Sequence, residues 1–266
     1  MIYTKARIAK WVTLGLFAAA LAGRVCGQED GGTDSSRKGI ELAKKGDYEA
    51  AAVQFSQAIK ANPKNARYYS NRGKAYRAGG KLAEAEADFT KLMELDTDDA
   101  NAYSERGKVR VSQKQFDTAI ADLSKAIEMS PGDIDSYRFR AFAHLSKNDF
   151  EKAVEDYSFV LEEKKGDTQA QERRGFAYIS LKKYDEAIAD FDKVIAKTPK
   201  DAEALRRRGY AHAMAGNKDK AVADYQAVLK LKPGDADAAT RLKAIEAKTA
   251  APGASPAAAG APPAGR

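Results

Sequence analysis

The sequence Arg72-Gly73-Lys74-Ala75-Tyr76 begins a pattern that continues with Ala85 and Phe89 and then returns along the chain. Gly73 and Gly107 occupy equivalent places, so the step is 34 residues. Three slots recur in six consecutive units: a small residue at Gly39, Gly73, Gly107, Ala141, Gly175 and Gly209; an alanine at Ala51, Ala85, Ala119, Ala153, Ala187 and Ala221; and a large apolar residue at Phe55, Phe89, Leu123, Tyr157, Phe191 and Tyr225. A period of this length without insertions indicates a solenoid built from one supersecondary unit.

The small slots predict that pairs of helices approach one another closely. Two antiparallel helices pack ~8–10 Å apart only where one of them presents a small side chain. The large residue four positions after each alanine lies on the same helical face and fills the space beside it. Four units close with a proline, which stops a helix. These prolines are Pro63, Pro131, Pro199 and Pro233, whereas Thr97 and Lys165 stand in that slot in the second and fourth units.

This combination of small residue, following aromatic, alanine, second aromatic and closing proline resembles the tetratricopeptide repeat (TPR). The resemblance covers Gly32 to Asp235. It implies an all-α fold, a right-handed α-solenoid of six antiparallel helix pairs with a C-terminal capping helix. The chain departs from the family at the slot before the small residue, where the family usually has leucine. That slot holds Lys38 and then Arg72, Arg106, Arg140, Arg174 and Arg208.

The repeat divides the chain into predicted segments. The six units are expected at 32–65, 66–99, 100–133, 134–167, 168–201 and 202–235. Asp34, Ser35 or Ser36 is expected to cap a short first helix, and the next helix is expected to begin at Tyr48. Residues 236–248 predict the capping helix, in which Lys243 occupies the small slot and prevents further stacking. Residues 249–266, rich in Ala, Pro and Gly, are expected to form a disordered tail.

The N-terminal segment predicts export. Lys5, Arg7 and Lys10 precede an apolar run from Trp11 to Ala22, the composition of a signal peptide over residues 1–27, with a polar linker at 28–35. Cleavage after Gly27 or after Ala22 fits the small residues there, and an uncleaved anchor is the alternative. Arg24 and Val25 make a poor lipobox before Cys26, which disfavours a lipoprotein. We expect a periplasmic or secreted protein, anchored to the membrane only if the leader remains.

Composition and motifs favour a protein without enzymatic activity. The net charge is +7, but the first 27 residues carry four basic residues and no acid, which leaves about +3 for the rest. The basic balance is therefore poor evidence for nucleic-acid binding. The single cysteine excludes a disulfide framework within the chain. His144 and His212 are two units apart and are expected to pack between helices. With no catalytic set, metal-ligand spacing or phosphate loop, we expect no cofactor and no metal.

An acidic residue follows each arginine of the departing slot by sixteen residues, at Asp88, Asp122, Asp156, Asp190 and Asp224. This recurrence favours a ladder of ion pairs between packed helices, because each arginine is accompanied by its own carboxylate. The alternative is a row of arginines that binds anions.

The resemblance places the concave face of the solenoid on the first helix of each unit. There it implies a peptide-binding groove formed by Arg67, Asn71, Lys74, Arg77, Lys108, Arg138, Phe139, Phe142, Arg173, Phe176, Arg207 and Tyr210. Phe142, Phe176 and Tyr210 share one slot and predict an aromatic shelf, unless these rings only pack between helices. Of the clamp with which some TPR domains hold a chaperone's terminal carboxylates, only Asn71 is matched, so that clamp is absent.

Two functions therefore remain, with a third that needs a partner the sequence does not name. The first is a scaffold that binds an unidentified protein or peptide in the groove, within an envelope assembly. The second is a binder of an acidic polymer or nucleic acid through basic groove residues, whose affinity would fall steeply with salt. The basic residues are Lys74, Arg77, Arg138, Arg173 and Arg207. The third is a subunit or regulator of an enzyme.

Export can be tested on the protein from its native cell. We expect N-terminal sequencing of the mature protein to start near Gln28 or Gly23, since the leader carries the features that a signal peptidase requires. Full-length protein recovered from the cytosol would contradict the assignment of a signal peptide.

Overall fold

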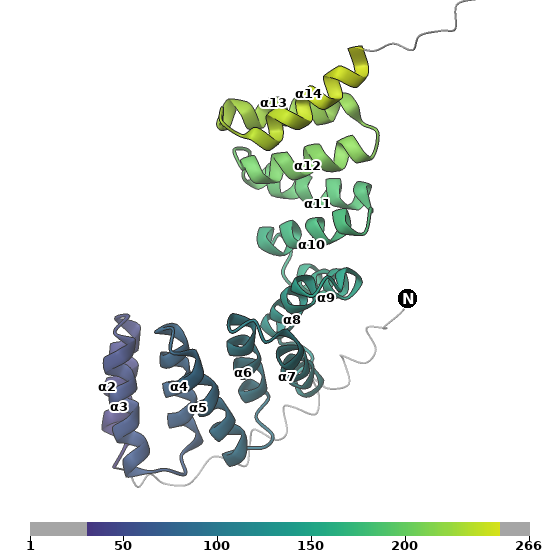
Figure 1. The fold of residues 1–266 in the computed structure, drawn as a ribbon. Helices are drawn as coiled ribbons and strands as arrows, with labels where there is room; N and C mark the ends of the chain where they lie inside the picture. The colour runs from purple at the N-terminus through teal and green to yellow at the C-terminus, as the bar shows by residue number, and fades with distance from the viewer. Residues whose placement is uncertain (1–30, 251–266) are drawn as a thin grey trace, which may run out of the picture. The chain divides into compact units, whose positions relative to one another are not determined.

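The computed structural model describes residues 31–250 (Figure 1). The expected leader, residues 28–30 of the expected linker and residues 251–266 of the expected tail lie outside this range. None of the helices among the described residues is both long enough and apolar enough to span a bilayer.

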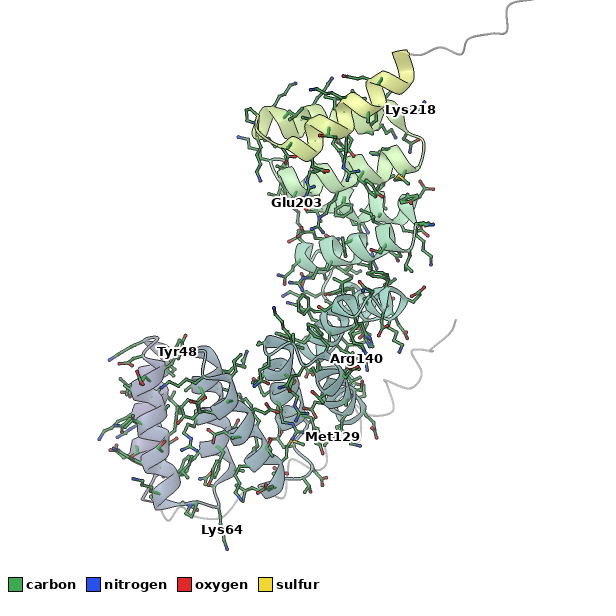
Figure 2. All side chains as sticks on the ribbon, in the orientation of Figure 1. Tyr48, Lys64, Met129, Arg140, Glu203 and Lys218 are labelled. Carbon is green, nitrogen blue, oxygen red and sulfur yellow. The ribbon has the colours of Figure 1, made fainter. Side chains whose placement is uncertain are left out.

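The described part of the chain is all-α, with thirteen helices and no strand, which confirms the predicted fold class. The helices are α2 (Thr33–Lys44), α3 (Tyr48–Ala61), α4 (Ala66–Ala78), α5 (Leu82–Leu95), α6 (Ala100–Ser112), α7 (Phe116–Met129), α8 (Ile134–Ser146), α9 (Phe150–Glu163), α10 (Thr168–Ser180), α11 (Tyr184–Lys197), α12 (Ala202–Met214), α13 (Lys218–Leu231) and α14 (Ala236–Ala250). They form two compact units, and from here on the first unit is the one that ends at Leu95 and the second unit is the one that begins at Asp96. Each 34-residue unit of the sequence pattern is called a repeat. In each unit, consecutive helices pair as in TPR solenoids, and side chains fill the space between neighbours (Figure 2).

The small slots lie at the helix crossings, as predicted. All six alanines of the second slot are fully buried, and so are the large residues of the third slot except Phe55, at 2% exposed. The packing leaves little room at the glycines of the first slot: a Cβ on Gly107 would lie 2.6 Å from the Leu123 side chain. The equivalent Cβ on Gly73 would lie 3.0 Å from the ring of Phe89. The close approach of the two helices in each pair therefore depends on these small residues.

The ends of the second helices do not depend on proline. The second helix of every repeat ends two residues before the proline slot. This includes α5 and α9, where that slot is Thr97 or Lys165. The following helices begin with capping side chains, because Asn65, Asp99, Asp133, Asp167 and Asp201 each accept a hydrogen bond from a backbone N–H of the first turn.

The first helix of the first repeat, α2, is not capped as expected. The N-cap of α2 is Gly32, which has no side chain to cap the helix, so the expectation that Asp34, Ser35 or Ser36 caps it is wrong. A Cβ on Gly32 would lie 2.7 Å from the carbonyl oxygen of Ala58, so the close approach of this turn to α3 requires glycine. Helix α2 therefore begins at Thr33, inside the expected linker, and α14 extends two residues beyond the expected end of the capping helix.

The turn between the two helices of a repeat contains a residue with a left-handed backbone conformation, which the sequence pattern did not predict. This slot also recurs every 34 residues, at Gly46, Gly80, Lys114, Asn148, Lys182 and Gly216, with φ between 59° and 83°. Residues with a Cβ are strained in this conformation, whereas glycine is not. Lys114 and Lys182 therefore reduce stability at turns that the other units make with glycine or asparagine.

We expect Lys182→Gly to stabilise the protein by about 1 kcal/mol, because it removes the strain of a left-handed non-glycine residue. The reverse change, Gly216→Lys, should destabilise it by a similar amount, since a Cβ there meets no neighbour within 4 Å and only the backbone conformation is at issue. Urea denaturation followed by circular dichroism measures both. A loss of stability in the Lys182 variant would show that the lysine side chain contributes more than its strain costs.

Candidate functional site

The predicted ion-pair ladder is present and is structural. In each of the five pairs the arginine Nε and Nη2 donate to the two oxygens of its aspartate, at 2.6–2.9 Å. These pairs are Arg72–Asp88, Arg106–Asp122, Arg140–Asp156, Arg174–Asp190 and Arg208–Asp224. All five aspartates are buried. The geometry is bidentate, which is the strong form of this interaction.

Most ladder arginines also contact the helix that precedes their own. The Nη1 of Arg140 donates to Ser124 on α7, and that of Arg174 donates to Ser158 on α9, at 2.9–3.1 Å. On α4, the hydrogen bonds to Asp88 raise the pKa of the Arg72 guanidinium, although burial opposes this shift. The guanidinium groups are thus already bonded on both sides. This excludes the ladder as a row of free anion-binding arginines.

The second unit carries a different row of contacts on its first helices. The guanidinium carbons of Arg173, Arg207 and Arg241 lie 4.5, 5.2 and 4.8 Å from the ring centroids of Phe142, Phe176 and Tyr210 respectively. These cation–π contacts join α8 to α10, α10 to α12 and α12 to α14. Between α6 and α8 the roles are exchanged, because there Lys108 lies over the ring of Phe139 at 5.9 Å.

Phe142, Phe176 and Tyr210 thus lie on α8, α10 and α12, and one face of each ring is covered by an arginine of the following first helix or of α14. Phe176 remains 38% exposed and meets the edge of Phe150 at 6.5 Å between centroids. Phe142 and Tyr210 are half-buried. The rings thus serve both as contacts between repeats and as accessible surface.

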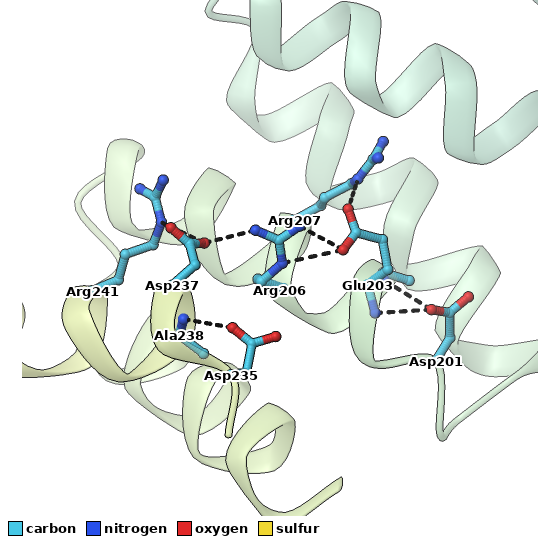
Figure 3. Close-up of polar contacts among 9 residues, drawn as sticks. Asp201, Glu203, Arg206, Arg207, Asp235, Asp237, Ala238 and Arg241 are labelled. Atoms are coloured by element: carbon cyan, nitrogen blue, oxygen red, sulfur yellow. Dashed lines mark hydrogen bonds and ion pairs between the residues drawn. The ribbon is translucent and has the colours of Figure 1, made fainter. Parts of the chain in front are cut away.

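At the C-terminal end of this row the arginines are neutralised by carboxylates of the same surface (Figure 3). Glu203 accepts hydrogen bonds from Arg206 and Arg207, both at 2.6 Å, and Asp237 accepts from Arg206 and Arg241 at 2.8 Å. Burial alone would raise the pKa of Glu203, but the hydrogen bonds from Arg206 and Arg207 hold it below its usual value. Hydrogen bonds from Arg241 likewise lower the pKa of Asp237. The carboxylates of this network therefore stay ionised, and its three arginines and two carboxylates keep one net positive charge.

Arg173 differs from its neighbours. Arg138 forms an ion pair with Asp167 at 2.7 Å, and Arg207 and Arg241 are paired as described. No carboxylate of the described residues lies within 4.0 Å of the Arg173 guanidinium. The difference arises four residues earlier on the helix. Glu203 and Asp237 lie four residues before Arg207 and Arg241, whereas the equivalent residue before Arg173 is Gln169, which carries no charge.

A cavity of about 650 Å³ opens beside Arg173 and is formed by α6, α7, α8 and α10. Its apolar wall consists of Val111, Phe116, Phe139 and Phe142. Its charged lining residues are Lys114, Arg138 and Arg173, and no carboxylate residue lines it. We call this cavity the cationic pocket. It has the size and the mixture of apolar and polar surface that ligand sites usually have.

Two smaller cavities continue along the same helices. One of about 350 Å³ lies between Phe142, Arg173 and Phe176 and shares Arg173 with the cationic pocket. The other, of about 330 Å³, is bordered by Phe176, Tyr210 and the paired arginines around Glu203. Together the three cavities follow the first helices of the second unit from α6 to α14.

The remaining residues expected in the groove lie elsewhere or are less accessible. Arg67, Asn71, Lys74 and Arg77 lie on α4 in the first unit, where Arg67 and Lys74 are exposed and the other two are half-buried. Lys108 was expected at an accessible groove position, but it is only 9% exposed and forms an ion pair with Glu105 at 3.3 Å.

Other residues were assigned correctly or missed. His144 and His212 are buried between helices, as expected, and burial lowers the pKa of both. Sequence reasoning missed Arg241, although it stands one repeat after Arg207, because residues 236–248 were treated only as a cap. No group of three or more potential metal ligands is found within residues 31–250.

The stacked helix pairs and their recurrent close contacts define a helical-repeat interaction protein. The family model for the tetratricopeptide repeat matches residues 36–100, 104–168, 140–199 and 172–236, well over half of the chain. The chain therefore belongs to the TPR family. Proteins of this family are generally scaffolds without enzymatic activity that bind protein or peptide partners, and the fold of this chain is that of such a scaffold.

Several solved structures resemble this fold. YrrB, described as a TPR protein with an unusual peptide-binding site, is 24% identical with a TM-score of 0.67, over 71% of this chain and 97% of its own. MamA is 29% identical with a TM-score of 0.57, over 62% and 96%. A TPR protein from Parabacteroides merdae is 21% identical with a TM-score of 0.62, over 82% and 87%. No curated protein matches the chain.

The contribution of the ladder can be measured by removing one carboxylate. Asp190→Asn should destabilise the protein by roughly 3 kcal/mol, because it leaves the largely buried Arg174 without its counter-ion. Asp192→Asn is the matched control: it removes an aspartate that is 54% exposed, while its partner Arg208 keeps Asp224, so the loss should be about 0–1 kcal/mol. Equal denaturation midpoints for the two variants would show that the ladder does not contribute to stability.

Proposed function

We propose that this protein is a non-enzymatic scaffold that holds an extended or helical segment of a partner protein along the first helices α6, α8, α10, α12 and α14 of its second unit. The observation that carries this proposal is the series of cavities on these helices, each bordered by an aromatic ring and an arginine of the adjoining repeat. Such rings can act as apolar anchors, and their fixed arginines add polar contacts without much loss of side-chain freedom.

Binding of an acidic polymer or nucleic acid is less well supported by this surface. Of the basic residues considered for it, Arg138 and Arg207 are already paired with Asp167 and Glu203. At the C-terminal end of the cavities, Glu203 and Asp237 already accept hydrogen bonds from Arg206, Arg207 and Arg241, which leaves fewer donors for the phosphates of a polyanion. A peptide or protein segment, which presents apolar side chains and few charges, fits the alternation of rings and neutralised arginines better.

We propose further that the scaffold acts outside the cytoplasm, in an envelope assembly. The support for this location is the composition of residues 1–27, whose basic start, apolar run and small residues suit an exported protein.

The proposed groove is tested with the full chain as bait in its native extract, followed by titration of variants against the partner that is captured. Phe176→Ala should weaken binding at least about tenfold, since a buried aromatic anchor contributes ~2 kcal/mol or more to an interface. Lys74→Ala should cost less, because an exposed charge contributes ~0–1 kcal/mol.

Val53→Ala is the control for a general loss of exposed apolar surface: Val53 is 53% exposed on α3, a second helix. All variants should keep their helical circular dichroism. If Lys74→Ala weakens binding more than Phe176→Ala, the site is on the first unit. A steep decrease of affinity with salt would favour the polyanion alternative.

A further inference from the structure

We propose that the cationic pocket recognises a partner segment in which a large apolar side chain lies within one or two residues of an aspartate or glutamate. This inference rests on the proposed function and specifies the chemistry of its partner. The apolar side chain would occupy the space against Phe116, Phe139 and Phe142, and the carboxylate would bind the guanidinium of Arg173.

The charge of the pocket is what selects an acidic partner. Lys114, Arg138 and Arg173 line it, and its lining contains no aspartate or glutamate. The charge of Arg138 is offset by Asp167, and Lys114 is exposed at the rim, so Arg173 is the partly buried cation without a counter-ion. A basic partner would be repelled, and a neutral one would leave this guanidinium without a charged acceptor.

Arg173 is also held in place for this role. Its guanidinium carbon lies 4.5 Å from the centroid of the Phe142 ring, the shortest of the cation–π contacts along this surface. A guanidinium that rests on a ring face still has N–H groups at its edge to donate to a carboxylate. Because the ring already restricts the side chain, less conformational entropy is lost when a ligand binds.

The apolar part of the pocket is large enough for a side chain. Val111 is buried at its wall, and Phe116, Phe139 and Phe142 are half-buried around it. The volume of about 650 Å³ exceeds that of one aromatic side chain, and Arg173 and Phe142 also border the next cavity along the helices. A segment that places an apolar residue in the pocket can therefore continue toward Phe176 and pass Arg173 on the way.

The same arrangement argues against a polyanion. A nucleic acid or polyphosphate gains affinity from several cations at once. Here Arg173 is followed along the surface by Arg206, Arg207 and Arg241, whose charges are largely offset because they pair with Glu203 and Asp237. One carboxylate next to one apolar side chain is the chemistry that the pocket complements.

The residue that leaves Arg173 without a counter-ion, Gln169, is also the one whose substitution tests the proposal most directly. Gln169 stands four residues before Arg173, at the place where Glu203 pairs with Arg207 and Asp237 pairs with Arg241. Gln169→Glu should therefore supply the missing carboxylate and neutralise Arg173 while its contact with Phe142 remains. Arg173→Gln removes the charge itself.

The experiment selects binders to the immobilised full chain from a display library of random peptides. The best sequence is then synthesised in three forms: unchanged, with its acidic residue converted to the amide, and with its large apolar residue converted to alanine. We expect selected peptides to carry a large apolar residue within two positions of Asp or Glu. Both altered peptides should bind at least about tenfold more weakly, as expected for loss of a charge-assisted contact or an apolar anchor.

The variants assign the contact to its residues. Arg173→Gln and Gln169→Glu should each weaken the unchanged peptide at least about tenfold and leave the amide peptide nearly unaffected, since only the acidic form uses the guanidinium charge. Arg207→Gln should weaken it less, because Glu203 already neutralises that arginine. Lys193→Gln, at an exposed position on α11, controls for net charge.

Several results would overturn the inference. Selected peptides without Asp or Glu, an amide peptide that binds as well as the acidic one, or failure to select any peptide would each exclude this pocket chemistry. A fluorescent single-stranded oligonucleotide that binds more tightly than the peptides, and loses binding on Arg173→Gln, would assign the pocket to a polyanion. These outcomes leave the proposed function to be judged separately. Peptides that bind through Phe176 but not through Arg173 would support the proposed groove and contradict only the chemistry proposed for the cationic pocket.

Discussion

The two helices of each repeat approach so closely that one position of the first helix has almost no room for a side chain. That position holds glycine in five units and alanine in one, and it lies against the large residue of the second helix. The residues next to this contact are fixed by it. Arg72 precedes Gly73, and Asp88 precedes Phe89, so packing of the ring against the glycine also brings the arginine and the aspartate together. The core contact and the ion pair are thus two parts of one arrangement.

Much of this could be predicted from the sequence because it repeats in the sequence. The period identifies helix pairs, the buried alanines and the Arg–Asp ladder, since each involves residue types that return every 34 positions. The left-handed turn position was missed because lysine or asparagine occupies it in half of the units, and only the backbone shows that Lys114 and Gly80 adopt the same conformation. The N-cap of the first helix was also assigned wrongly, since three polar candidates adjoin a glycine that closely approaches α3.

The candidate site was predicted only in outline, for a physical reason. Position along the first helices indicates which residues can face the groove, but accessibility and free charge depend on contacts between repeats. Lys108 and Lys74 share a slot, yet Lys108 is buried beside Glu105 and over Phe139. Arg173 and Arg207 also share a slot, and what separates them is the residue one helical turn earlier. A single amide, Gln169, in place of a carboxylate thus leaves Arg173 without the counter-ion that Arg207 has.

The cation–π contacts lie at the junctions between successive repeats. Each joins a ring to the arginine found 31 residues later, so the contact belongs to the junction between two repeats rather than to either one. If recombination removed residues 168–201 as one unit, Arg207 would come to lie over Phe142, and it would bring Glu203 with it. The junction would keep its packing and its stacked arginine but lose its charge. Such repeat arrays can therefore change the chemistry of a surface by exchange of whole units, without any new contact having to arise by substitution.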